Sequence, residues 1–538
     1  MATDVPNRRH LRPSGKGMLA TAISTAAAVS SAVDPPHIVF VLADDYGFND
    51  VSYHARKNGN DTNVIHTPAL DALAAQGVKL ENYYVQPVCS PTRAALLTGR
   101  YGSHTGIHVP LVDSAPGGLP LDEILLPQLL RAAGYRTAMV GKWHLGFVTW
   151  GHTPQERGFD SYFGFYAGST DYYSLQSECW PAQWRDGCFE AENGGEPVAG
   201  FDLRRGREVL TNSSTYSTEL FTAEAERVIA SHPKQGPPLF LYLAHQAVHV
   251  GNAPVASHPT WALQQVPARY AAPYAFVADE QRRLLSGMVA ALDESVSNLT
   301  GALHAAGMWE RTLLVFSTDN GGPTTQAASN YPLRGGKATC WEGGTRGIGF
   351  VSGGARSGLS ARVRGGESSA MIHVTDWLPT LCEVAGCALT QHGDEGGTRT
   401  GTMTTKRLDG VSAWGAISRG EVSPRTEILI SLIEVSGSPA LRVGDYKLLG
   451  RPPQLYNLRD DPGESNDLAA RMPAKVAELQ ARLAEHNATA VPPCDRQRPD
   501  PASSPRLHSG AWMPWRASVV GNGCPQERWL TKMTTSTQ

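Results

Sequence analysis

The sequence has few charged residues, no long run of either charge and, after its first 33 residues, no long apolar stretch. Charged side chains make up 18% of the 538 residues, and the net charge is -3. This composition does not indicate a nucleic-acid partner, which would favour clustered basic residues. Because a membrane-spanning helix needs ~20 predominantly apolar residues, we expect no membrane span in the mature chain.

Cysteine is also scarce, because eight residues in a chain of this length are too few for a disulfide scaffold. In an oxidising compartment the chain could form three disulfide bonds: Cys179 with Cys188, Cys382 with Cys387, and Cys494 with Cys524. This pairing leaves Cys89 and Cys340 as single cysteines. A single cysteine is more often structural than catalytic, so a catalytic role needs further evidence from the surrounding residues.

The N-terminal residues have the pattern of a targeting segment. Four basic residues precede an uncharged, Ala-rich run from Met18 to Val33: Arg8, Arg9, Arg12 and Lys16. A basic region, an apolar region and small residues in this order are typical of a secretory signal, and we interpret residues 1–33 as a signal peptide. The Ser and Thr content and the long basic region leave a signal anchor or an organellar transit segment as alternatives.

Four N-x-[ST] sequons are consistent with passage through the secretory pathway. They lie at Asn60, Asn212, Asn298 and Asn487. Such short motifs also occur by chance, so the prediction of a secreted or lysosomal protein depends mainly on the N-terminal segment.

The length of the chain exceeds what one ordinary core organises and predicts a large domain with a smaller one. We expect the large domain over residues 36–420 and the smaller one over residues 421–495. In the second range the segments ILISLIEV, ALRVGDYKLLG and PQLYNL predict short antiparallel strands, and residues 475–486 predict a helix, as in an α+β domain. Residues 496–538 lack periodicity and predict an irregular tail.

Four short apolar runs each end in charged or metal-binding side chains. Residues 37–43 lead into Asp44 and Asp45, residues 137–141 into Lys142 and His144, residues 239–244 into His245 and His249, and residues 313–317 into Asp319 and Asn320. Continuous apolar runs favour strands that are covered on both faces, as in a largely parallel α/β sheet. Helical patterns fall between them at residues 70–77, 125–134 and 281–306. Ligands bind beyond the carboxyl ends of such strands, so we expect these polar residues to converge on one site.

The segment CSPTRAALLTGRY, residues 89–101, places a potentially reactive sulfur ahead of a predicted short helix. Ser90 is expected to be the N-cap, Pro91 the first helical residue, and Gly99 a left-handed C-terminal cap. Cys89 would then lie at the positive end of the helix, where free N–H groups and the helix dipole favour a sulfate or phosphate. Arg93 adds a planar cation nearby.

The predicted strand ends supply only oxygen donors for a metal: Asp44, Asp45, Asp319 and Asn320. Such ligands favour calcium or magnesium over zinc or copper. Each pair taken alone also fits a turn, and Lys142 and Lys337 taken alone fit solvated surface charges. Their positions argue for a site, because Lys142 follows a buried strand and Lys337 lies among glycines that allow close backbone approach.

Cys89-Ser-Pro-Thr-Arg93 followed by Leu-Thr-Gly-Arg100 resembles the C-x-P-[ST]-R…L-T-G-R signature of the type I sulfatases. The resemblance covers about residues 37–495 and favours arylsulfatase B-like enzymes. It extends through PLDEILLPQLLRAAGY, RGFDSYFGF, STDNGG, WEGGTRG, HVTDWLPTL and LYNLRDDPGESNDLA. It implies an alkaline-phosphatase-like α/β fold, with a large mixed, mostly parallel sheet flanked by helices, and makes residues 36–420 the catalytic domain. The smaller domain would carry an antiparallel sheet.

The resemblance also implies a sulfatase with site residues that can be named in this sequence. The catalytic residues would be Cys89, Arg93, His144 and His249. Those binding the substrate would be Lys142, His249 and Lys337. One calcium ion per chain would be bound by Asp44, Asp45, Cys89, Asp319 and Asn320. His245 has no counterpart in the family pattern and fits a structural role.

In this family a formylglycine-generating enzyme oxidises the cysteine to formylglycine (3-oxoalanine), and the hydrate of that aldehyde is the nucleophile. The resemblance therefore implies that position 89 attacks sulfur, while calcium and the cations Lys142, Lys337 and Arg93 stabilise the developing oxygen charge. His249 would protonate the departing alcohol. His144 would help to deprotonate the second hydroxyl, so that the aldehyde re-forms and sulfate leaves.

The expected substrates are small aryl sulfates and a sulfated carbohydrate such as N-acetylgalactosamine 4-sulfate. The chain departs from the family pattern at Cys340, where a larger apolar residue is expected, and in extra residues between His249 and Tyr270. His258 and Trp261 in this insertion either reshape the sugar pocket or belong to a surface loop without contact.

Two alternatives to a sulfatase remain at the level of the sequence. One is a phosphatase or phosphonate hydrolase of the same superfamily. The other is a catalytically silent protein that keeps Cys89 as a thiol and binds sulfated glycans.

Overall fold

The computed structural model describes residues 34–59, 65–179, 198–252, 264–391, 404–432, 439–494 and 499–519. The predicted targeting segment, residues 1–33, lies outside them. All elements described below belong to one compact unit, Pro35–Gln538. No helix in the described ranges has the length and hydropathy needed to cross a membrane.

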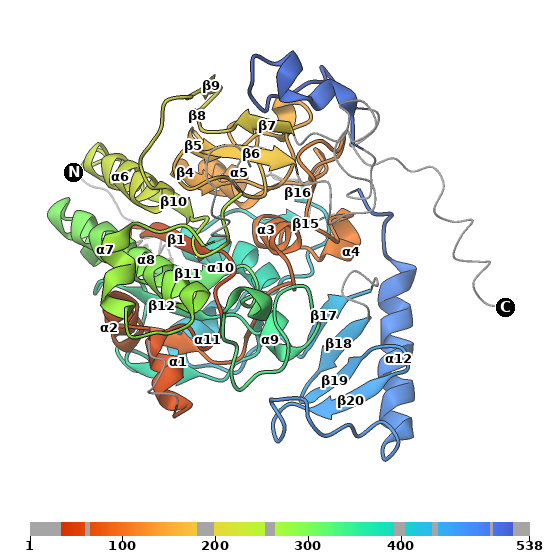
Figure 1. The fold of residues 1–538 in the computed structure, drawn as a ribbon. Coiled ribbons are helices and arrows are strands. Elements are labelled where there is room, and N and C mark those ends of the chain that lie inside the picture. Colours follow the sequence, from red (N-terminus) through yellow and green to blue (C-terminus); the bar gives the residue numbers. More distant parts are fainter. Residues whose placement is uncertain are drawn as a thin grey trace, which may run out of the picture. The chain divides into compact units, whose positions relative to one another are not determined.

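Ten strands within the described residues form one mixed sheet (Figure 1). In order across the sheet they are β13 (Gly366–Ser368), β2 (Val78–Leu80), β12 (Gly349–Gly353), β11 (Thr312–Thr318), β1 (His37–Ala43), β10 (Leu239–Ala244), β4 (Arg136–Lys142), β5 (Ser161–Phe165), β8 (Arg204–Arg205) and β9 (Glu208–Val209). The four predicted strands are the adjacent parallel strands β11, β1, β10 and β4. Their carboxyl ends therefore meet at one edge, as the sequence predicted.

The central strands are buried on both faces because their side chains alternate between two cores. In β1, Ile38 and Phe40 belong to one core, and Val39 and Val41 belong to the other. Each such side chain contributes roughly 1.5–3 kcal/mol when fully buried. This explains why the strand sequences are apolar throughout instead of alternating with polar residues.

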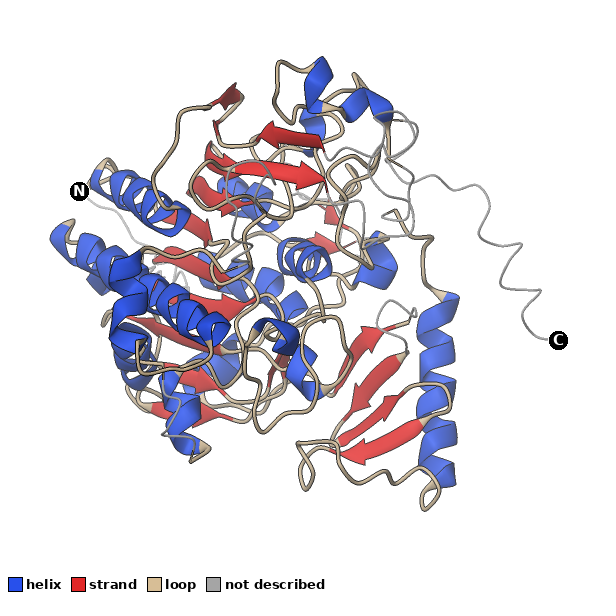
Figure 2. Cartoon of the chain, viewed as in Figure 1, coloured by secondary structure: helices blue, strands red, loops and turns tan. Residues whose placement is uncertain are grey.

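Helices cover both faces of the sheet (Figure 2). One core includes residues of α2 (Pro68–Gln76), α6 (Ser217–Ala230) and α8 (Glu280–Ala305). The other includes residues of α3 (Cys89–Thr98), α5 (Leu126–Ala132) and α10 (Trp377–Ala385). The helices predicted at residues 70–77, 125–134 and 281–306 are confirmed as α2, α5 and α8.

Helix α3 carries Cys89 and is buried along its whole length. Gly99 adopts a left-handed conformation (φ 67°) and ends the helix, as predicted. The prediction that Ser90 caps the helix is wrong, because the helix begins at Cys89 with Val88 as the N-cap. The Ser90 hydroxyl instead donates to the His144 carbonyl (2.9 Å) and accepts from a backbone N–H (3.1 Å), so tertiary contacts use the group that the local sequence assigned to capping.

The C-terminal segment forms a separate antiparallel sheet, as predicted. Its strands are β17 (Glu427–Ser431), β18 (Ala440–Val443), β19 (Tyr446–Leu449) and β20 (Gln454–Asn457). One face packs on α12 (Pro473–Ala488), the predicted helix, through a cluster that includes Leu441, Leu455 and Leu479. Its other face packs against Tyr84, Cys340 and Met371 in a second apolar cluster.

Shorter elements complete the described fold. They are α1 (Ser52–Lys57), α4 (Gly102–Thr105), α7 (Ala268–Ala271), α9 (Glu342–Thr345), α11 (Trp414–Arg419), and the strand pairs β3 (Tyr83–Tyr84) with β14 (Ile372–His373), β6 (Gln176–Cys179) with β7 (Val198–Phe201), and β15 (Thr390–Gln391) with β16 (Thr404–Thr405). The described part of the tail, residues 499–519, contains two 3₁₀ turns and an isolated β-bridge between Ala511 and Phe201. Its buried Trp512 donates the indole N–H to the Ser177 carbonyl (2.9 Å).

The cysteines only partly follow the pairing that the sequence allowed. Cys382 and Cys387 are free thiols, so the structure does not support this pair. Cys494 is disulfide-bonded, whereas Cys188 and Cys524 lie outside the described residues. The sequon residues Asn212, Asn298 and Asn487 are exposed, and Asn60 lies outside the described residues.

Candidate active site

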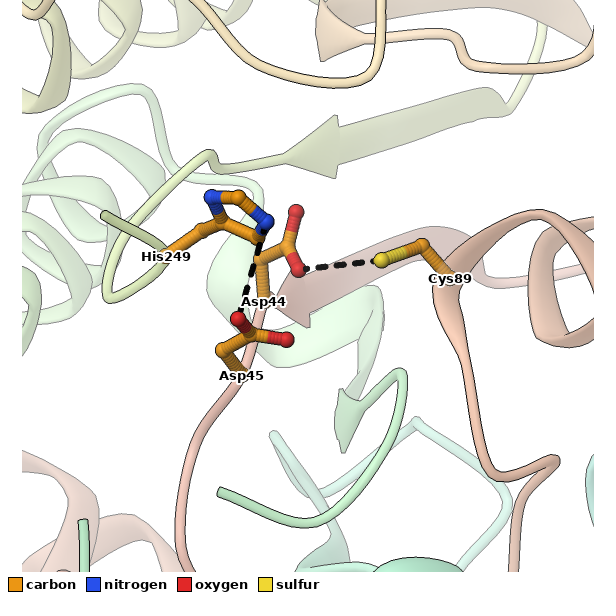
Figure 3. A group of neighbouring side chains, drawn as sticks. All are labelled: Asp44, Asp45, Cys89 and His249. Carbon is orange, nitrogen blue, oxygen red and sulfur yellow. Dashed lines mark hydrogen bonds and ion pairs between the residues drawn. The ribbon is translucent and has the colours of Figure 1, made fainter. Parts of the chain in front are cut away.

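The predicted site residues converge where the central strands end. Asp44 and Asp45 follow β1, Asp319 and Asn320 follow β11, Lys142 ends β4, and His249 lies five residues beyond β10. Ligand atoms of Asp44, Asp45, Cys89 and His249 all lie within 4.8 Å of one another (Figure 3). Backbone hydrogen bonds hold the strand ends together, because Asp44 N–H donates to the Ala247 carbonyl (2.9 Å) and Asp319 N–H donates to the Ala43 carbonyl (3.0 Å).

A cavity of about 470 Å³ opens over these residues. Its lining includes Cys89, His144, His249 and Lys337. The volume suits a small ligand or one or two sugar units. Arg93 and Lys142 do not line the cavity, and both are fully buried behind the carboxylates.

Two buried cations hold the innermost carboxylates. Lys142 Nζ lies 2.5 Å from Asp44 Oδ2, and Arg93 Nη2 lies 3.2 Å from Asp44 Oδ2 and 2.8 Å from Asp319 Oδ2. Burial alone would raise the pKa of Asp44, but the charges of Lys142, His249 and Arg93 outweigh it and hold the pKa well below its usual range. Burial and the Asp44 charge raise the pKa of Asp319. These carboxylates therefore repel each other, and a further cation between them would favour the ionised form of both.

The outer part of the cluster contains an amide oxygen without a partner. Asp45 Oδ2 lies 2.7 Å from Lys337 Nζ, and Asp45 Oδ1 accepts a hydrogen bond from Asn320 Nδ2 (2.8 Å). Asn320 Oδ1 is buried and has no hydrogen-bond partner among the described residues. Buried acceptors in native proteins are almost always satisfied. An oxygen-binding cation beside three carboxylates would satisfy this one, so the residues fit a calcium site.

Cys89 is poorly suited to act as a thiol. Its Sγ donates to Asp44 Oδ1 over 3.7 Å. Burial and the Asp44 charge raise the pKa of the thiol to about 12, so the sulfur stays protonated near neutral pH. A reactive cysteine needs the thiolate. The environment of Cys89 therefore does not support a role for the unmodified thiol as nucleophile.

His144 is held as a neutral imidazole with one free nitrogen. Its Nε2 lies 3.0 Å from the Leu111 carbonyl, which only accepts, so the ring proton is on Nε2. Its Nδ1 is buried without a described partner and keeps its lone pair. Burial and the nearby Lys142 lower the pKa of His144 well below its ordinary value. Like Asp45 (φ 58°), His144 (φ 54°) has a left-handed backbone, a strained conformation typical of functional sites.

His249 faces Asp45 (Figure 3). Its Nδ1 lies 2.8 Å from the Val250 carbonyl and therefore carries a proton, which leaves Nε2 3.6 Å from Asp45 Oδ2. The Tyr172 hydroxyl donates to the His249 carbonyl (2.7 Å) and fixes the backbone. Burial and Lys337 lower the pKa of His249, while Asp45 opposes this change.

His245 is not part of the site, as its lack of a family counterpart suggested. It is fully buried, and its Nε2 lies 2.9 Å from Ser295 Oγ on α8. Burial lowers its pKa to about 3. The imidazole is therefore a neutral structural group that links β10 to α8.

We expect His245 to make the fold less stable in acid. In the unfolded chain it binds a proton below its ordinary pKa of 6.5, whereas in the folded protein it stays neutral down to about pH 3. Its contribution is complete above pH 6.5 and is lost as the pH falls, by about 1.4 kcal/mol per pH unit. His245→Gln should therefore make the loss of stability between pH 6 and pH 4 less steep, as measured by denaturant unfolding. His304→Gln, an exposed change on α8, is the control, and an unchanged slope in His245→Gln would contradict the assignment.

Several residues around the cavity were not predicted from the sequence. Asp113 and Glu178 also line it, and Tyr172 and Gln246 hold the loop that carries His249. Gln246 lies between His245 and the predicted site residue His249. Only their spatial position identifies Asp113, Glu178 and Tyr172. His258 and Trp261 of the insertion lie outside the described residues, whereas Gly251 and Asn252 at its start line the cavity.

Comparisons with known proteins agree with this geometry. The Sulfatase family profile matches residues 36–387. The chain is 37% identical to arylsulfatase J of Mus musculus, over 91% of this chain and 81% of that protein. It is 32% identical to N-acetylgalactosamine-6-sulfatase of Mus musculus, over 59% of this chain and 57% of that protein.

A solved structure shows the same fold. The crystal structure of Ps i-CgsB in complex with k-i-k-neocarrahexaose superposes with a TM-score of 0.70 at 27% identity, covering 88% of this chain and 98% of that chain. The expectation of an alkaline-phosphatase-like sulfatase fold is thereby confirmed. With a family match over more than half of its length and a relative at 37% identity, the chain belongs to the sulfatase family and is a sulfuric ester hydrolase.

Proposed function

We propose that the protein is a calcium-dependent sulfatase in which Cys89 is converted to formylglycine. The observation that carries the proposal is the convergence of Asp44, Asp45, Cys89 and His249 within 4.8 Å, beside a cavity that Cys89 and His249 line. Conversion of Cys89 requires a formylglycine-generating enzyme as a partner during maturation. That partner, the N-terminal segment and the exposed sequons together support a route through the secretory pathway to a secreted or lysosomal protein.

Calcium would be held by Asp44, Asp45, Asp319, Asn320 and an oxygen at position 89. When bound, it supplies positive charge that polarises a sulfate oxygen. Without it, three carboxylates face three cations, so the cluster is nearly neutral before any divalent ion enters. With a divalent ion bound, the cluster would carry a net positive charge and would attract a sulfate ester, which is an anion.

Hydrated formylglycine supplies one hydroxyl as nucleophile and a second hydroxyl whose deprotonation allows sulfate to leave. Lys337 lines the cavity and is the cation that can contact the sulfate oxygens directly. Lys142 and Arg93 are buried against Asp44 and Asp319 and act mainly by keeping those carboxylates ionised and in place. The charge-stabilising role that the family resemblance implies for Arg93 is therefore proposed as an indirect one.

The two histidines suit different proton transfers. Nδ1 of His144 is a free acceptor and suits removal of a proton from the hydroxyl that expels sulfate. Nε2 of His249 faces the cluster and suits delivery of a proton to the departing alcohol. The negative charge of a bound sulfate ester favours protonated His249 and offsets the pKa-lowering effect of burial.

The proposed substrates are small aryl sulfates and a sulfated carbohydrate of the N-acetylgalactosamine sulfate type. Similarity to N-acetylgalactosamine-6-sulfatase and to a protein crystallised with k-i-k-neocarrahexaose supports a carbohydrate. The arylsulfatase B-like preference for the 4-sulfate depends on loops, and loops vary between relatives more than the catalytic floor does.

The proposed function predicts a preference for sulfate over phosphate esters. We expect kcat/KM for 4-nitrophenyl sulfate to exceed that for 4-nitrophenyl phosphate by at least about tenfold, or 1.4 kcal/mol in transition-state stabilisation. Paired steady-state kinetics on one preparation would measure this ratio. A preference for the phosphate would instead support the alternative of a phosphatase or phosphonate hydrolase on the same fold.

A further inference from the structure

Lys337 is presented to the active site by a loop that is closed at its base. In this Lys337 loop, residues 334–343, the carbonyl of the first residue accepts a hydrogen bond from the N–H of the last (2.8 Å). At the tip, Lys337 Nζ lies 2.7 Å from Asp45 Oδ2. The next residue, Ala338, donates its N–H to the Pro87 carbonyl (2.8 Å), just before helix α3. Lys337 is therefore held by backbone contacts at the tip of the loop and by the closed base of the loop.

Glu464, in the connection that follows β20, holds both ends of the Lys337 loop. Its carbonyl oxygen accepts a hydrogen bond from Arg334 Nη1 (3.1 Å), and its Oε2 accepts one from the Glu342 N–H (2.6 Å). The Arg334 guanidinium also lies over the Trp341 ring, 3.7 Å from its centroid. One residue of the C-terminal segment thus contacts both the beginning and the end of the loop.

Glu464 is itself held by a buried lysine of the C-terminal sheet. Lys447, in β19, has its Nζ 2.8 Å from Glu464 Oε1 and 3.0 Å from Glu342 Oε1. The side chains of Lys447 and Glu342 are fully inaccessible to solvent, as is Glu464. Burial would lower the pKa of Lys447, but Glu464 and Glu342 raise it above its ordinary value, so the amine stays charged. The Tyr84 hydroxyl donates to Glu342 Oε2 (2.5 Å).

A buried network of charged residues adds little net stability to a fold. Removing charges from water costs so much that an apolar cluster of the same size often stabilises a protein equally well. What a buried ionic network adds is directional contact, because each partner is satisfied in only one arrangement. Here the directional contacts reach the Arg334 guanidinium at the beginning of the Lys337 loop and the Glu342 N–H next to its last residue.

We propose that the Lys447 network, made of Lys447, Glu342 and Glu464, positions Lys337 for contact with the sulfate group. The C-terminal sheet thereby takes part in catalysis through the Lys337 loop without touching the substrate. The inference rests on the role of Lys337 given under the proposed function. A misplacement of about 1 Å in a group that contacts the reacting centre costs on the order of 100-fold in rate.

A double-mutant cycle with Lys337 tests this coupling. Lys447→Met should lower kcat/KM for 4-nitrophenyl sulfate about 10- to 100-fold when Lys337 is present. In a Lys337→Met background the same change should lower it less than about threefold, because the group that the network positions is already absent. Glu464→Gln provides a second, nearly isosteric disruption if Lys447→Met folds poorly. Lys447→Arg, which keeps the charge, should restore most of the activity.

Arg425→Met is the matched control for loss of a buried ion pair. Arg425, at the start of the C-terminal segment, has its Nε 2.7 Å from Asp376 Oδ2. Its other side-chain hydrogen bonds go to residues outside the Lys337 loop: Tyr101, Thr375, Asp409 and Glu427. This variant should lower the thermal midpoint as the network variants do, yet leave kcat/KM of the folded protein unchanged. An effect on stability is thereby separated from an effect on Lys337.

Three results would overturn the inference, and each is distinct from failure of the proposed function. Equal losses of kcat/KM in both Lys337 backgrounds would show that the network does not act through Lys337. A lowered thermal midpoint with unchanged kcat/KM in Lys447→Met and Glu464→Gln would leave the network a purely structural role. An unchanged kcat/KM in Lys337→Met would remove the target of the positioning. Failure of the proposed function would instead appear as an unmutated protein with no activity on 4-nitrophenyl sulfate.

Discussion

Cys89→Ser is expected to abolish multiple turnover of 4-nitrophenyl sulfate while leaving the fold intact. A serine hydroxyl can accept sulfate once, but it has no second hydroxyl to expel the sulfate again. Product should therefore not exceed about one equivalent per protein molecule, and the steady-state loss should be on the order of 10⁶-fold, as for removal of the nucleophile in other hydrolases. A time course of product formation, calibrated against the protein concentration, measures the product formed per protein molecule and the steady-state rate.

The fold and the state of residue 89 need separate controls. Cys387→Ser, which changes a free thiol outside the site, should keep full activity and the same thermal midpoint. The mass of the peptide that contains residue 89 should show the aldehyde or its hydrate in the unmutated protein. Substantial steady-state turnover by Cys89→Ser would rule out the formylglycine mechanism, and a free thiol in an inactive preparation would support the alternative of a silent glycan-binding protein.

Removal of the metal is expected to abolish activity and to lower the thermal midpoint. The cluster contains three carboxylates and an amide oxygen, Asn320 Oδ1, that has no partner among the described residues. A ligand that binds only the folded state adds RT ln(1 + [L]/Kd) to the free energy of unfolding, or about 4 kcal/mol when the ligand is present at about 1,000 times its Kd. Treatment with a strong chelator, followed by unfolding and activity assays, would measure both losses.

Adding single metal ions to the metal-free protein and measuring activity identifies the metal. Calcium should restore activity and stability to the metal-free protein better than zinc, because the donors are oxygen atoms. Asn320→Ala should require a higher calcium concentration for the same activity, since it removes one ligand without changing the net charge. A metal-free preparation, verified by elemental analysis, that works as well as the original would contradict the calcium site.

The sequence alone predicted which residues meet at the candidate active site. The four central strands lie within one residue of their predicted bounds, because strands buried on both faces must be apolar throughout and are followed abruptly by polar residues. Parallel pairing then brings the strand ends to one edge, so Asp44, Lys142, His249 and Asp319 had to be neighbours. The Gly99 cap of helix α3 was equally predictable, because few residues other than glycine adopt φ near 67° without strain.

Only the tertiary structure decided what each of these side chains does. Arg93 contacts Asp44 and Asp319 instead of the cavity, and the Leu111 carbonyl decides which nitrogen of His144 carries the proton. Ser90 lost its predicted capping role to a contact with a residue 54 positions away. Such pairings join segments far apart in the chain, and the direction of a side chain depends on the packing around it. Local pattern therefore determined which residues reach the site, and long-range packing determined their partners, charge states and protonation.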